Sequence, residues 1–457
     1  MIKLNAYKDQ VIGVFGLGKA GLATVQALVA GGAKVVAWDD SEEGRKAVQA
    51  LNLDVRLHNT SKWPWDHMSL VVLSPGVPLN YPEPHPVVKD ARLHCCPVVG
   101  DIELLYQAQP HATYVTITGT NGKSTTTTLI GHILKHAGKK VQIGGNIGTA
   151  ALSLEPLDED GIYVLELSSY QLDLVATTRF DIALMLNISP DHIDRHGSID
   201  GYVAAKMHMF DHQTEYDQAI IAIDDAYTRG AVEDLRHSPA TLTTVTTTNE
   251  DADLAVVDGM IRGQGHVIDL NKIRSLQGRH NWQNAISAYA VARALKVDLD
   301  VIDAAMGIFP GLEHRMEWVR AQDNITFIND SKATNANAAS YALGAWDNIY
   351  WILGGVAKEG GINTLHPYFS KVKRAYLIGE AQNSFAETLG GEVMHSKCTT
   401  LEQALTKAYA DAMQESPDGA TILFSPACAS FDQYKNFEAR GRHFKELVGE
   451  LLDIAGS

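Results

Sequence analysis

The sequence predicts an α/β protein with three domains, and two features of the chain lead to that prediction. The chain has 457 residues, which is more than a single hydrophobic core usually supports. Three blocks of the sequence each begin with an apolar strand that runs into a glycine-containing turn and then a helix. This order of elements builds parallel sheets covered by helices. We expect domains at residues 1–105, 106–310 and 311–457.

The first block predicts a small βαβ domain. An apolar strand over residues 11–15 is followed by a glycine turn at residues 16–21 and a helix that ends near Ala30. A strand over residues 34–38 ends at Asp39, and another, over residues 70–73, runs into Ser74-Pro75-Gly76. The polar residues after these strands are candidates for ligand binding, because open α/β sheets bind ligands at strand ends.

The second and third blocks repeat this pattern with more strands. In the second block we expect strands at residues 114–118, 162–165, 181–186 and 218–223, with helices at residues 123–136 and 282–295. The apolar residues of the last helix recur at helical spacing, so it is predicted to pack one face against a core. In the third block we expect strands at residues 325–328, 349–353, 374–378 and 420–424, and a helix at residues 434–451.

Composition narrows the possible partners and the compartment. The formal net charge of -16 argues against a general nucleic-acid or membrane binder, since those need a cationic surface. The four cysteines match neither a zinc spacing nor a disulfide framework. The N-terminus lacks the apolar core of a signal peptide, and no window approaches a membrane helix. We expect a cytoplasmic protein with no nucleic-acid or membrane partner.

The strongest chemical motif is Gly119-Thr120-Asn121-Gly122-Lys123-Ser124-Thr125, between a predicted strand and a predicted helix. Backbone N–H groups and the helix N-terminus at such a junction hold phosphate oxygens. Lys123 would neutralise phosphate charge, and Ser124 or Thr125 would offer a hydroxyl to Mg²⁺. The full P-loop pattern has a glycine where Ile117 stands. An ordinary glycine turn with a solvated lysine is the alternative interpretation.

The first glycine turn, Gly16-x-Gly18-x-x-Gly21, satisfies the dinucleotide fingerprint together with Asp39. Taken alone, it would indicate a nicotinamide cofactor. The same loop can bind any diphosphate, because its donors are backbone groups and a helix terminus. The acidic Asp39 could equally accept a hydrogen bond from a uracil. A tight turn without a ligand is the third possibility.

Other candidate residues carry weaker signals. Glu166 ends a predicted strand and is placed to hold Mg²⁺, although glutamates at strand ends are also common on surfaces. The run Asp191-His192-Ile193-Asp194-Arg195-His196 gathers metal-ligand types, but by pattern alone it is more often a polar turn. Lys206 is normally read as an exposed helix lysine.

Together these residues resemble the Mur ligase family, the ATP-dependent amide ligases of peptidoglycan precursor synthesis, over essentially the whole chain. The resemblance rests on the loop at residues 119–125 and on six further motifs. These are Gly144-Gly145-Asn146-Ile147-Gly148, Glu166-Leu167-Ser168-Ser169, Asp191-His192-Ile193-Asp194-Arg195, His314-Arg315, Asp330-Ser331-Lys332-Ala333-Thr334-Asn335 and Ser425-Pro426-Ala427-Cys428-Ala429-Ser430. The last two point to the branch of the family that adds D-glutamate.

The resemblance implies an N-terminal Rossmann-like domain for a UDP-sugar, a central P-loop-type ATPase sheet and a C-terminal Rossmann-like domain for the amino acid. It implies that the carboxylate of UDP-N-acetylmuramoyl-L-alanine attacks ATP to give an acyl phosphate and ADP. The amine of D-glutamate then attacks the acyl carbon, and phosphate leaves. We expect a monomer.

The resemblance also assigns residues. Catalysis falls to Lys123, Glu166, His192 and Lys206. Ser124 and Glu166 hold one Mg²⁺, and His192 and Lys206 hold a second, with Lys206 carbamylated by CO₂. ATP is further contacted by Asn284, Arg315 and Asp330. The UDP-sugar contacts are Gly18, Lys19, Asp39, Ser74, Gly76, Asn146, Ser168 and His192. The D-glutamate pocket contains Thr334, Lys358, Ser430 and Phe437.

Two rival functions come from other classes. A nicotinamide-dependent oxidoreductase would use the turn at residues 16–21 and Asp39, but it would leave the loop at residues 119–125 and the third block without a role. A non-catalytic nucleotide-binding module would not need Lys123, Glu166, His192 and Lys206 together. Measuring ADP release with and without D-glutamate separates these rivals from a ligase.

Overall fold

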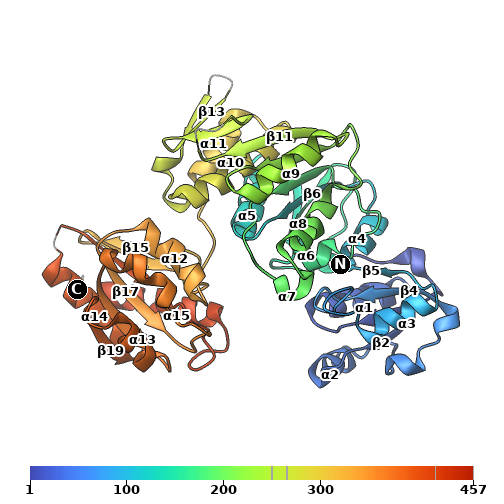
Figure 1. Ribbon diagram of the computed structural model, residues 1–457, viewed down its shortest axis with the longest axis horizontal. Helices are drawn as coiled ribbons and strands as arrows, with labels where there is room; N and C mark the ends of the chain where they lie inside the picture. The colour runs from blue at the N-terminus through green and yellow to red at the C-terminus, as the bar shows by residue number, and fades with distance from the viewer. Residues whose placement is uncertain (249–250, 264–265, 417, 456–457) are drawn as a thin grey trace. The chain divides into compact units, whose positions relative to one another are not determined.

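The computed structural model describes residues 1–248, 251–263, 266–416 and 418–455, which form two compact units. The first unit contains residues 1–272 and 279–309, and the second contains residues 273–278 and 310–457. Within the described residues the strands form three sheets, two in the first unit and one in the second (Figure 1). All three are built mainly from parallel strands, so the α/β class predicted from the sequence is confirmed.

The N-terminal sheet is parallel, with the strand order β3-β2-β1-β4-β5. Its strands are β1 (Val11–Phe15), β2 (Lys34–Trp38), β3 (Val55–Leu57), β4 (Met68–Leu73) and β5 (Val98–Val99). The accompanying helices are α1 (Lys19–Ala30), α2 (Glu42–Ala50), α3 (Pro86–Leu93) and α4 (Asp101–Ala108). The central strands β1 and β4 are mostly buried because helices cover both faces of the sheet.

The central sheet has the order β14-β13-β12-β11-β10-β9-β6-β8-β7, parallel except for β13 and β14 at one edge. Its strands are β6 (Thr113–Thr118), β7 (Lys140–Gly145), β8 (Gly161–Glu166), β9 (Ile182–Met185), β10 (Gln218–Ala222), β11 (Thr241–Thr246), β12 (Leu254–Val257), β13 (Met260–Gly263) and β14 (His266–Asp269). The helices are α5 (Lys123–His136), α6 (Ser169–Leu172), α7 (Ile193–His196), α8 (Ile199–Met207), α9 (Ala226–Arg236), α10 (Arg279–Ala294) and α11 (Leu299–Gly307).

The C-terminal sheet has the order β15-β16-β20-β17-β18-β19, with only the β15–β16 pair antiparallel. Its strands are β15 (Glu317–Gln322), β16 (Ile325–Asn329), β17 (Ile349–Gly354), β18 (Val372–Ile378), β19 (His395–Thr399) and β20 (Ala420–Phe424). The helices are α12 (Ala336–Ala345), α13 (Gln382–Leu389), α14 (Leu401–Glu415) and α15 (Phe437–Ala455). Two hydrophobic clusters form its core.

Two expectations about helices need correction. Helix α10 does not pack through one face, because Asn281 and every residue from Gln283 to Ala292 are buried. The helix contacts α5, α11 and the strands β10, β11 and β12, so it is enclosed on several sides. The last helix begins at Phe437 and not at Tyr434.

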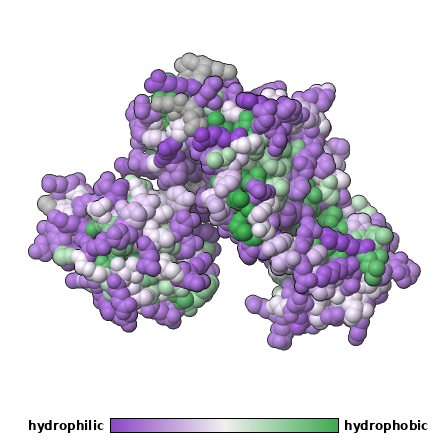
Figure 2. All heavy atoms as spheres, viewed as in Figure 1, coloured by the Kyte–Doolittle hydropathy of each residue, from purple (hydrophilic) through white to green (hydrophobic). Residues whose placement is uncertain are grey.

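The visible face of the molecule is covered mainly by hydrophilic side chains (Figure 2). Within the described part of the chain, helices of the length and apolar character needed to cross a bilayer are absent. This agrees with the sequence, in which charged residues make up 20% of the chain.

One buried carboxylate ties the N-terminal part of the first unit to its central part. Glu103, on α4, is 1% exposed and accepts hydrogen bonds from the backbone N–H groups of Ala176, Thr177 and Thr178 at 3.0, 3.0 and 3.1 Å. The hydroxyls of Thr177 and Thr178 also donate to it. Burial alone would raise the pKa of Glu103, but these hydrogen bonds outweigh burial and lower it.

Replacing Glu103 with Gln should destabilise the first unit by about 3 kcal/mol at pH 7, because an amide NH₂ group would face buried donors. The folded-state pKa of Glu103 is lowered, so its stabilisation is present at neutral pH and is lost as the pH falls through that pKa. The difference between wild type and Glu103→Gln in urea unfolding should therefore shrink in acid. Glu83→Gln, at an exposed ion pair with Lys89, is the control and should not shift the transition.

Candidate active site

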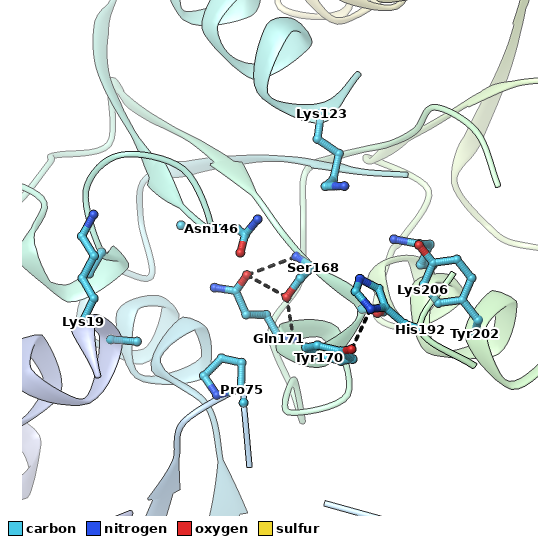
Figure 3. Close-up of a pocket in the computed structure, with 15 residues that line it drawn as sticks. Lys19, Pro75, Lys123, Asn146, Ser168, Tyr170, Gln171, His192, Tyr202 and Lys206 are labelled. Carbon is cyan, nitrogen blue, oxygen red and sulfur yellow. Dashed lines mark hydrogen bonds between the residues drawn. The ribbon is translucent and has the colours of Figure 1, made fainter. Parts of the chain in front are cut away.

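Seven of the residues that the resemblance assigns to the site line one cavity in the first unit. The cavity has a volume of about 410 Å³. Figure 3 shows residues that line it. The expected site residues on its wall are Lys19, Gly76, Lys123, Asn146, Ser168, His192 and Lys206. They come from loops after β4, β7, β8 and β9 and from helices α1, α5 and α8, so the carboxyl ends of two neighbouring sheets contribute to the wall.

The loop between β6 and α5 has the geometry of a phosphate-binding turn. Gly122 precedes α5 with φ of 83°, and no described side chain caps that helix N-terminus. A Cβ atom on Gly122 would lie 2.2 Å from Oδ1 of Asn284, so only glycine fits there. An uncapped helix N-terminus behind a glycine turn is suited to bind an anion.

Two asparagines hold this loop and the start of α5 in place through hydrogen bonds. Asn187, after β9, accepts a hydrogen bond from Asn121 N at 2.8 Å and donates to Asn121 O at 3.1 Å. Asn284 is 3% exposed; its Oδ1 accepts from the Thr126 hydroxyl, and its Nδ2 donates to Asn281. The predicted contact of Asn284 with adenine would have to compete with these bonds, and it stays a prediction.

Lys123 and Lys206 converge on the same carbonyl oxygen. The Nζ atoms of Lys123 and Lys206 donate to Gly119 O at 2.8 and 3.0 Å. Lys123 also bonds Thr120 O, and Lys206 bonds the Thr118 hydroxyl at 3.1 Å. Lys206 is 1% exposed, so its interpretation as a surface lysine is wrong. Burial, and then the charge of Lys123, hold the pKa of Lys206 well below its usual range.

Glu166 is buried at the end of β8, not exposed as a strand-end glutamate usually is. Its Oε1 accepts a hydrogen bond from Asn146 Nδ2 at 2.8 Å, and Asn146 N donates to Glu166 O. Its Oε2 is buried without a partner among the described residues. An unpaired buried carboxylate oxygen is costly unless a cation or donor binds it. Glu166 therefore fits a divalent cation.

His192 lies between β9 and α7 with a left-handed backbone, at φ of 53°. Its Nδ1 is hydrogen-bonded to the hydroxyl of Tyr170 at 2.8 Å, and its ring packs at 6.1 Å from that of Tyr202. Among the described residues, groups of three or more His, Cys, Asp and Glu side chains suited to a metal ion do not occur. A metal ion held by Glu166 or His192 would therefore need ligands of other types, such as hydroxyls, phosphate oxygens or a modified lysine.

A second histidine in this region has a structural role. His196 Nε2 is hydrogen-bonded to Ser169 Oγ at 2.9 Å, and its Nδ1 lies 3.7 Å from Asp173. The order Ser, His, Asp is that of a hydrolytic triad, but the 3.7 Å separation is too long for the orienting hydrogen bond. Burial, followed by the charge of Arg195, lowers the pKa of His196 to about 4. His196 is thus neutral at pH 7 and anchors the start of α6.

The glycine turn after β1 has one open position. Gly16 has φ of 88°, and a Cβ atom on Gly21 would lie 1.9 Å from Gly16 O, so both are required by the backbone. A Cβ atom on Gly18 would meet nothing within 4 Å, and the same holds for Gly76. The space beside Gly18 and Gly76 therefore allows a ligand to approach the backbone.

The other expected UDP-sugar residues have partners in the protein. Both carboxylate oxygens of Asp39 accept backbone hydrogen bonds, from Leu17 N and Ser41 N. Asp39 thus shapes the glycine turn. Lys19 Nζ is hydrogen-bonded to Gly148 O across the cavity wall. Ser74 follows β4. A Cβ atom on Gly16 would lie 2.4 Å from the Cβ atom of Ser74, so the two residues pack closely.

In the second unit the expected residues gather at the carboxyl ends of β16, β17 and β20. Val356 and Ala429 form a two-bond bridge that joins the loop of Lys358 to that of Ser430. Thr334 lies in the turn after β16. Phe437 starts α15, and its ring lies 4.1 Å from Lys332 Nζ. These loops bring Thr334, Lys358, Ser430 and Phe437 to one edge of the sheet.

Asp330 is buried at the same edge, and Arg315 lies in the turn before β15. The Asp330 carboxyl group accepts hydrogen bonds from the Ser425 hydroxyl at 2.7 Å and from Met316 N at 3.1 Å. Burial raises the pKa of Asp330 to about 7, although these two hydrogen bonds oppose the shift. The predicted contacts of Arg315 and Asp330 with ATP stay predictions.

Sequence reasoning missed several residues of the cavity. Tyr170, Gln171 and Tyr202 line it, and Asn187 holds the phosphate loop. One signal was present: Ser168 and Gln171 have the Ser-x-x-Gln spacing of a capping box, and the structure contains that box. The roles of Tyr170 and Tyr202 depend on tertiary contacts, and no local pattern marks them.

Comparison with known proteins places this site in a family. Three family models match the chain: "Mur ligase MurD-like, N-terminal domain" at residues 10–100, "Mur ligase middle domain" at residues 117–292 and "Mur ligase, glutamate ligase domain" at residues 314–428. A protein of Paramagnetospirillum magneticum named UDP-N-acetylmuramoylalanine--D-glutamate ligase is 46% identical to this chain, over 100% of both chains. The chain belongs to the Mur ligase family. A Rhodospirillum rubrum relative of the same name is 47% identical, over 99% of this chain and 97% of its own.

Solved Mur ligases share the fold. The crystal structure of MurF ligase from Thermotoga maritima in complex with ADP aligns with a TM-score of 0.60 at 15% identity, over 100% of this chain and 98% of that chain. A MurF structure from Acinetobacter baumannii aligns with a TM-score of 0.60 at 19% identity, over 92% and 91% of the two chains. At these identities the likeness concerns the fold alone. The expected Mur ligase architecture is confirmed, and the nicotinamide-dependent alternative is set aside.

The buried Asp330 gives a prediction about stability. Its folded-state pKa, about 7, lies above the usual value of 3.8, so its contribution to folding is lost as the pH rises through 7. Asp330→Asn keeps the shape of the side chain. The Ser425 hydroxyl, which donates to Asp330, can instead accept a hydrogen bond from the asparagine NH₂ group. The variant should be more stable than wild type at pH 8 by about 4 kcal/mol, and the two should be equally stable near pH 4. Thermal unfolding of both proteins across this range measures the difference, and a variant that is less stable at pH 8 would contradict the assignment.

Proposed function

We propose that this chain is an ATP-dependent ligase that adds D-glutamate to UDP-N-acetylmuramoyl-L-alanine in peptidoglycan precursor synthesis, releasing ADP and phosphate. The observation that carries the proposal is full-length identity of 46% and 47% to relatives that bear the name of this activity. The cavity of the first unit supports it, because Lys123 and Lys206 line it and meet at Gly119 O of the anion-binding loop. Asn146, which also lines the cavity, donates a hydrogen bond to the buried carboxylate of Glu166. We further propose a cytoplasmic monomer with domains at residues 1–105, 106–310 and 311–457.

ATP and Mg²⁺ would supply the phosphoryl group that activates the substrate carboxylate and the positive charge that steadies its transfer. We assign the phosphates to the loop at residues 119–125. Lys123 now bonds the carbonyls of its own loop, and it would exchange them for phosphate oxygens. Ser124, half-buried in the first turn of α5, and the unpaired Oε2 of Glu166 fit a first Mg²⁺.

Lys206 fits a second Mg²⁺ only after chemical modification, because an ammonium group cannot bind a cation. Its lowered pKa keeps a fraction of the amine neutral, and a neutral amine attacks the carbon of CO₂. The nitrogen then loses a proton, and the product is a carbamate whose single negative charge is shared by two oxygens. The carbamate nitrogen keeps one N–H, enough for the bond to Gly119 O. We assign the second Mg²⁺ to this carbamate and His192.

The remaining residues bind and orient the two substrates. We assign the UDP-sugar to Gly18, Lys19, Asp39, Ser74, Gly76, Asn146, Ser168 and His192. The open space beside Gly18 and Gly76 suits a diphosphate, and Lys19 supplies a cation. We assign D-glutamate to Thr334, Lys358, Ser430 and Phe437, where the exposed Lys358 and the hydroxyls can pair with two carboxylates.

The proposal predicts ADP release that requires both UDP-N-acetylmuramoyl-L-alanine and D-glutamate. D-aspartate is one methylene shorter and would leave one buried donor unpaired, so it should react about 10- to 100-fold more slowly. L-glutamate should react poorly as well, because anchoring both of its carboxylates moves the amine away from the acyl carbon. Equal rates with both glutamate enantiomers would contradict the assigned pocket.

Lys123→Ala is the matched loss-of-function variant in this assay. It removes the charge that neutralises the phosphates and should lower kcat at least about 100-fold without unfolding the protein. Lys135→Ala, at an exposed position in the last turn of the same helix, is the control and should keep wild-type turnover. Near-normal activity of Lys123→Ala would remove the loop at residues 119–125 from the mechanism.

A further inference from the structure

His192 is poorly fixed by its own surroundings. Its side chain is 44% exposed, and its backbone is in the left-handed region at φ of 53°, which is uncommon outside glycine. A half-exposed imidazole ring rotates unless a hydrogen bond fixes it. The position of the ring nitrogens therefore depends on one specific contact.

That contact is the hydroxyl of Tyr170. Tyr170 Oη lies 2.8 Å from His192 Nδ1, and the two ring centroids are 4.9 Å apart (Figure 3). The other ring nitrogen, Nε2, is 3.6 Å from Asp191 Oδ2, which is beyond hydrogen-bond distance. Tyr170 is thus the side chain that sets the orientation of the His192 ring.

Tyr170 is itself well fixed. It lies on α6, whose first turn is closed by the capping box of Ser168 and Gln171. The guanidinium group of Arg195 lies 4.7 Å from the centre of the Tyr170 ring. Arg195 is anchored in turn, because its Nη2 donates to Pro75 O and Val77 O, both at 3.2 Å. The Tyr170 hydroxyl is therefore a fixed point for His192.

We propose that Tyr170 is a positioning residue that accepts a hydrogen bond from Nδ1–H of His192 and leaves the lone pair of Nε2 free to bind a divalent cation. A histidine that binds a metal ion usually donates its other ring N–H to an acceptor, which fixes its tautomer. Both residues line the same cavity, so the arrangement lies where the cation is needed. This inference rests on the proposed function for the identity of the cation.

Tyr170→Phe tests the role of the hydroxyl alone. The concentration of Mg²⁺ needed for half-maximal ADP release should rise about 10-fold, in line with the loss of a partner that orients a metal ligand. The KM for D-glutamate should stay within about twofold, since Tyr170 belongs to the first unit and the residues assigned to that substrate belong to the second. Tyr163→Phe is the matched control: it removes a hydroxyl that bonds Glu155 O at 2.8 Å, and it should leave the Mg²⁺ dependence unchanged.

A second measurement needs no turnover. Nitrogen-15 NMR of the histidine rings in metal-free protein reports the tautomer of His192, with the resonance assigned by its loss in His192→Gln. Wild type and Tyr163→Phe should show Nδ1–H, and Tyr170→Phe should show a mixture of tautomers. Nε2–H in wild type, or an unchanged tautomer together with an unchanged Mg²⁺ dependence in Tyr170→Phe, would overturn the proposal. Absence of ligase activity in wild type would contradict the proposed function instead, and the tautomer would still decide the role of Tyr170.

Discussion

Two lysine amines share one carbonyl oxygen at the centre of this site, and the chemistry of the cavity depends on how they share it. Lys123 and Lys206 both donate to Gly119 O. Two positive charges about 4 Å apart repel by about 4 kcal/mol at an effective dielectric constant of about 20. The repulsion is relieved at lowest cost when Lys206 is neutral, since it is fully buried and Lys123 is only half-buried. In the mechanism that we propose, Lys123 thus remains a cation for phosphate, and Lys206 is available as a nucleophilic amine.

The surrounding elements maintain this arrangement. The shared carbonyl belongs to Gly119, so its position is set by the loop between β6 and α5. That loop is held by Asn187 from one side, and Gly122 lets it pack against Asn284. The same edge of the sheet carries Glu166, whose carboxylate, like that of Asp191, partly opposes the lowering of the Lys206 pKa. Tyr170 and His192 add a fixed imidazole to the same wall. The same set of loops therefore controls the position of the Gly119 carbonyl and the protonation of Lys206.

The sequence predicted the elements with strong local signals. β1, β2, β17 and β20 are apolar runs, two of them followed by glycine, and their predicted and observed bounds agree within one residue. Strands such as β11, with the sequence Thr-Leu-Thr-Thr-Val-Thr, or β19 were missed because their apolar content is low. At the site, the loop at residues 119–125 was visible because its chemistry lies in consecutive residues. The burial of Lys206 and the contact of Tyr170 with His192 arise only when separate loops meet, so no pattern in the chain reveals them. The role of Lys206 as a metal ligand was predicted from the family resemblance and not from the local sequence pattern.

The most direct test of this account is the chemical state of Lys206. Carbon-13 NMR of the protein in ¹³C-labelled bicarbonate detects a lysine carbamate as a resonance distinct from bicarbonate and CO₂. We expect a lysine carbamate resonance in the wild-type protein and its loss in Lys206→Ala, because burial lowers the pKa of Lys206 and leaves its amine neutral and able to react with CO₂. A carbamate of the Met1 α-amino group, whose ordinary pKa is about 8, would remain in both proteins. A wild-type protein that turns over D-glutamate at full rate without the lysine carbamate resonance would contradict the account.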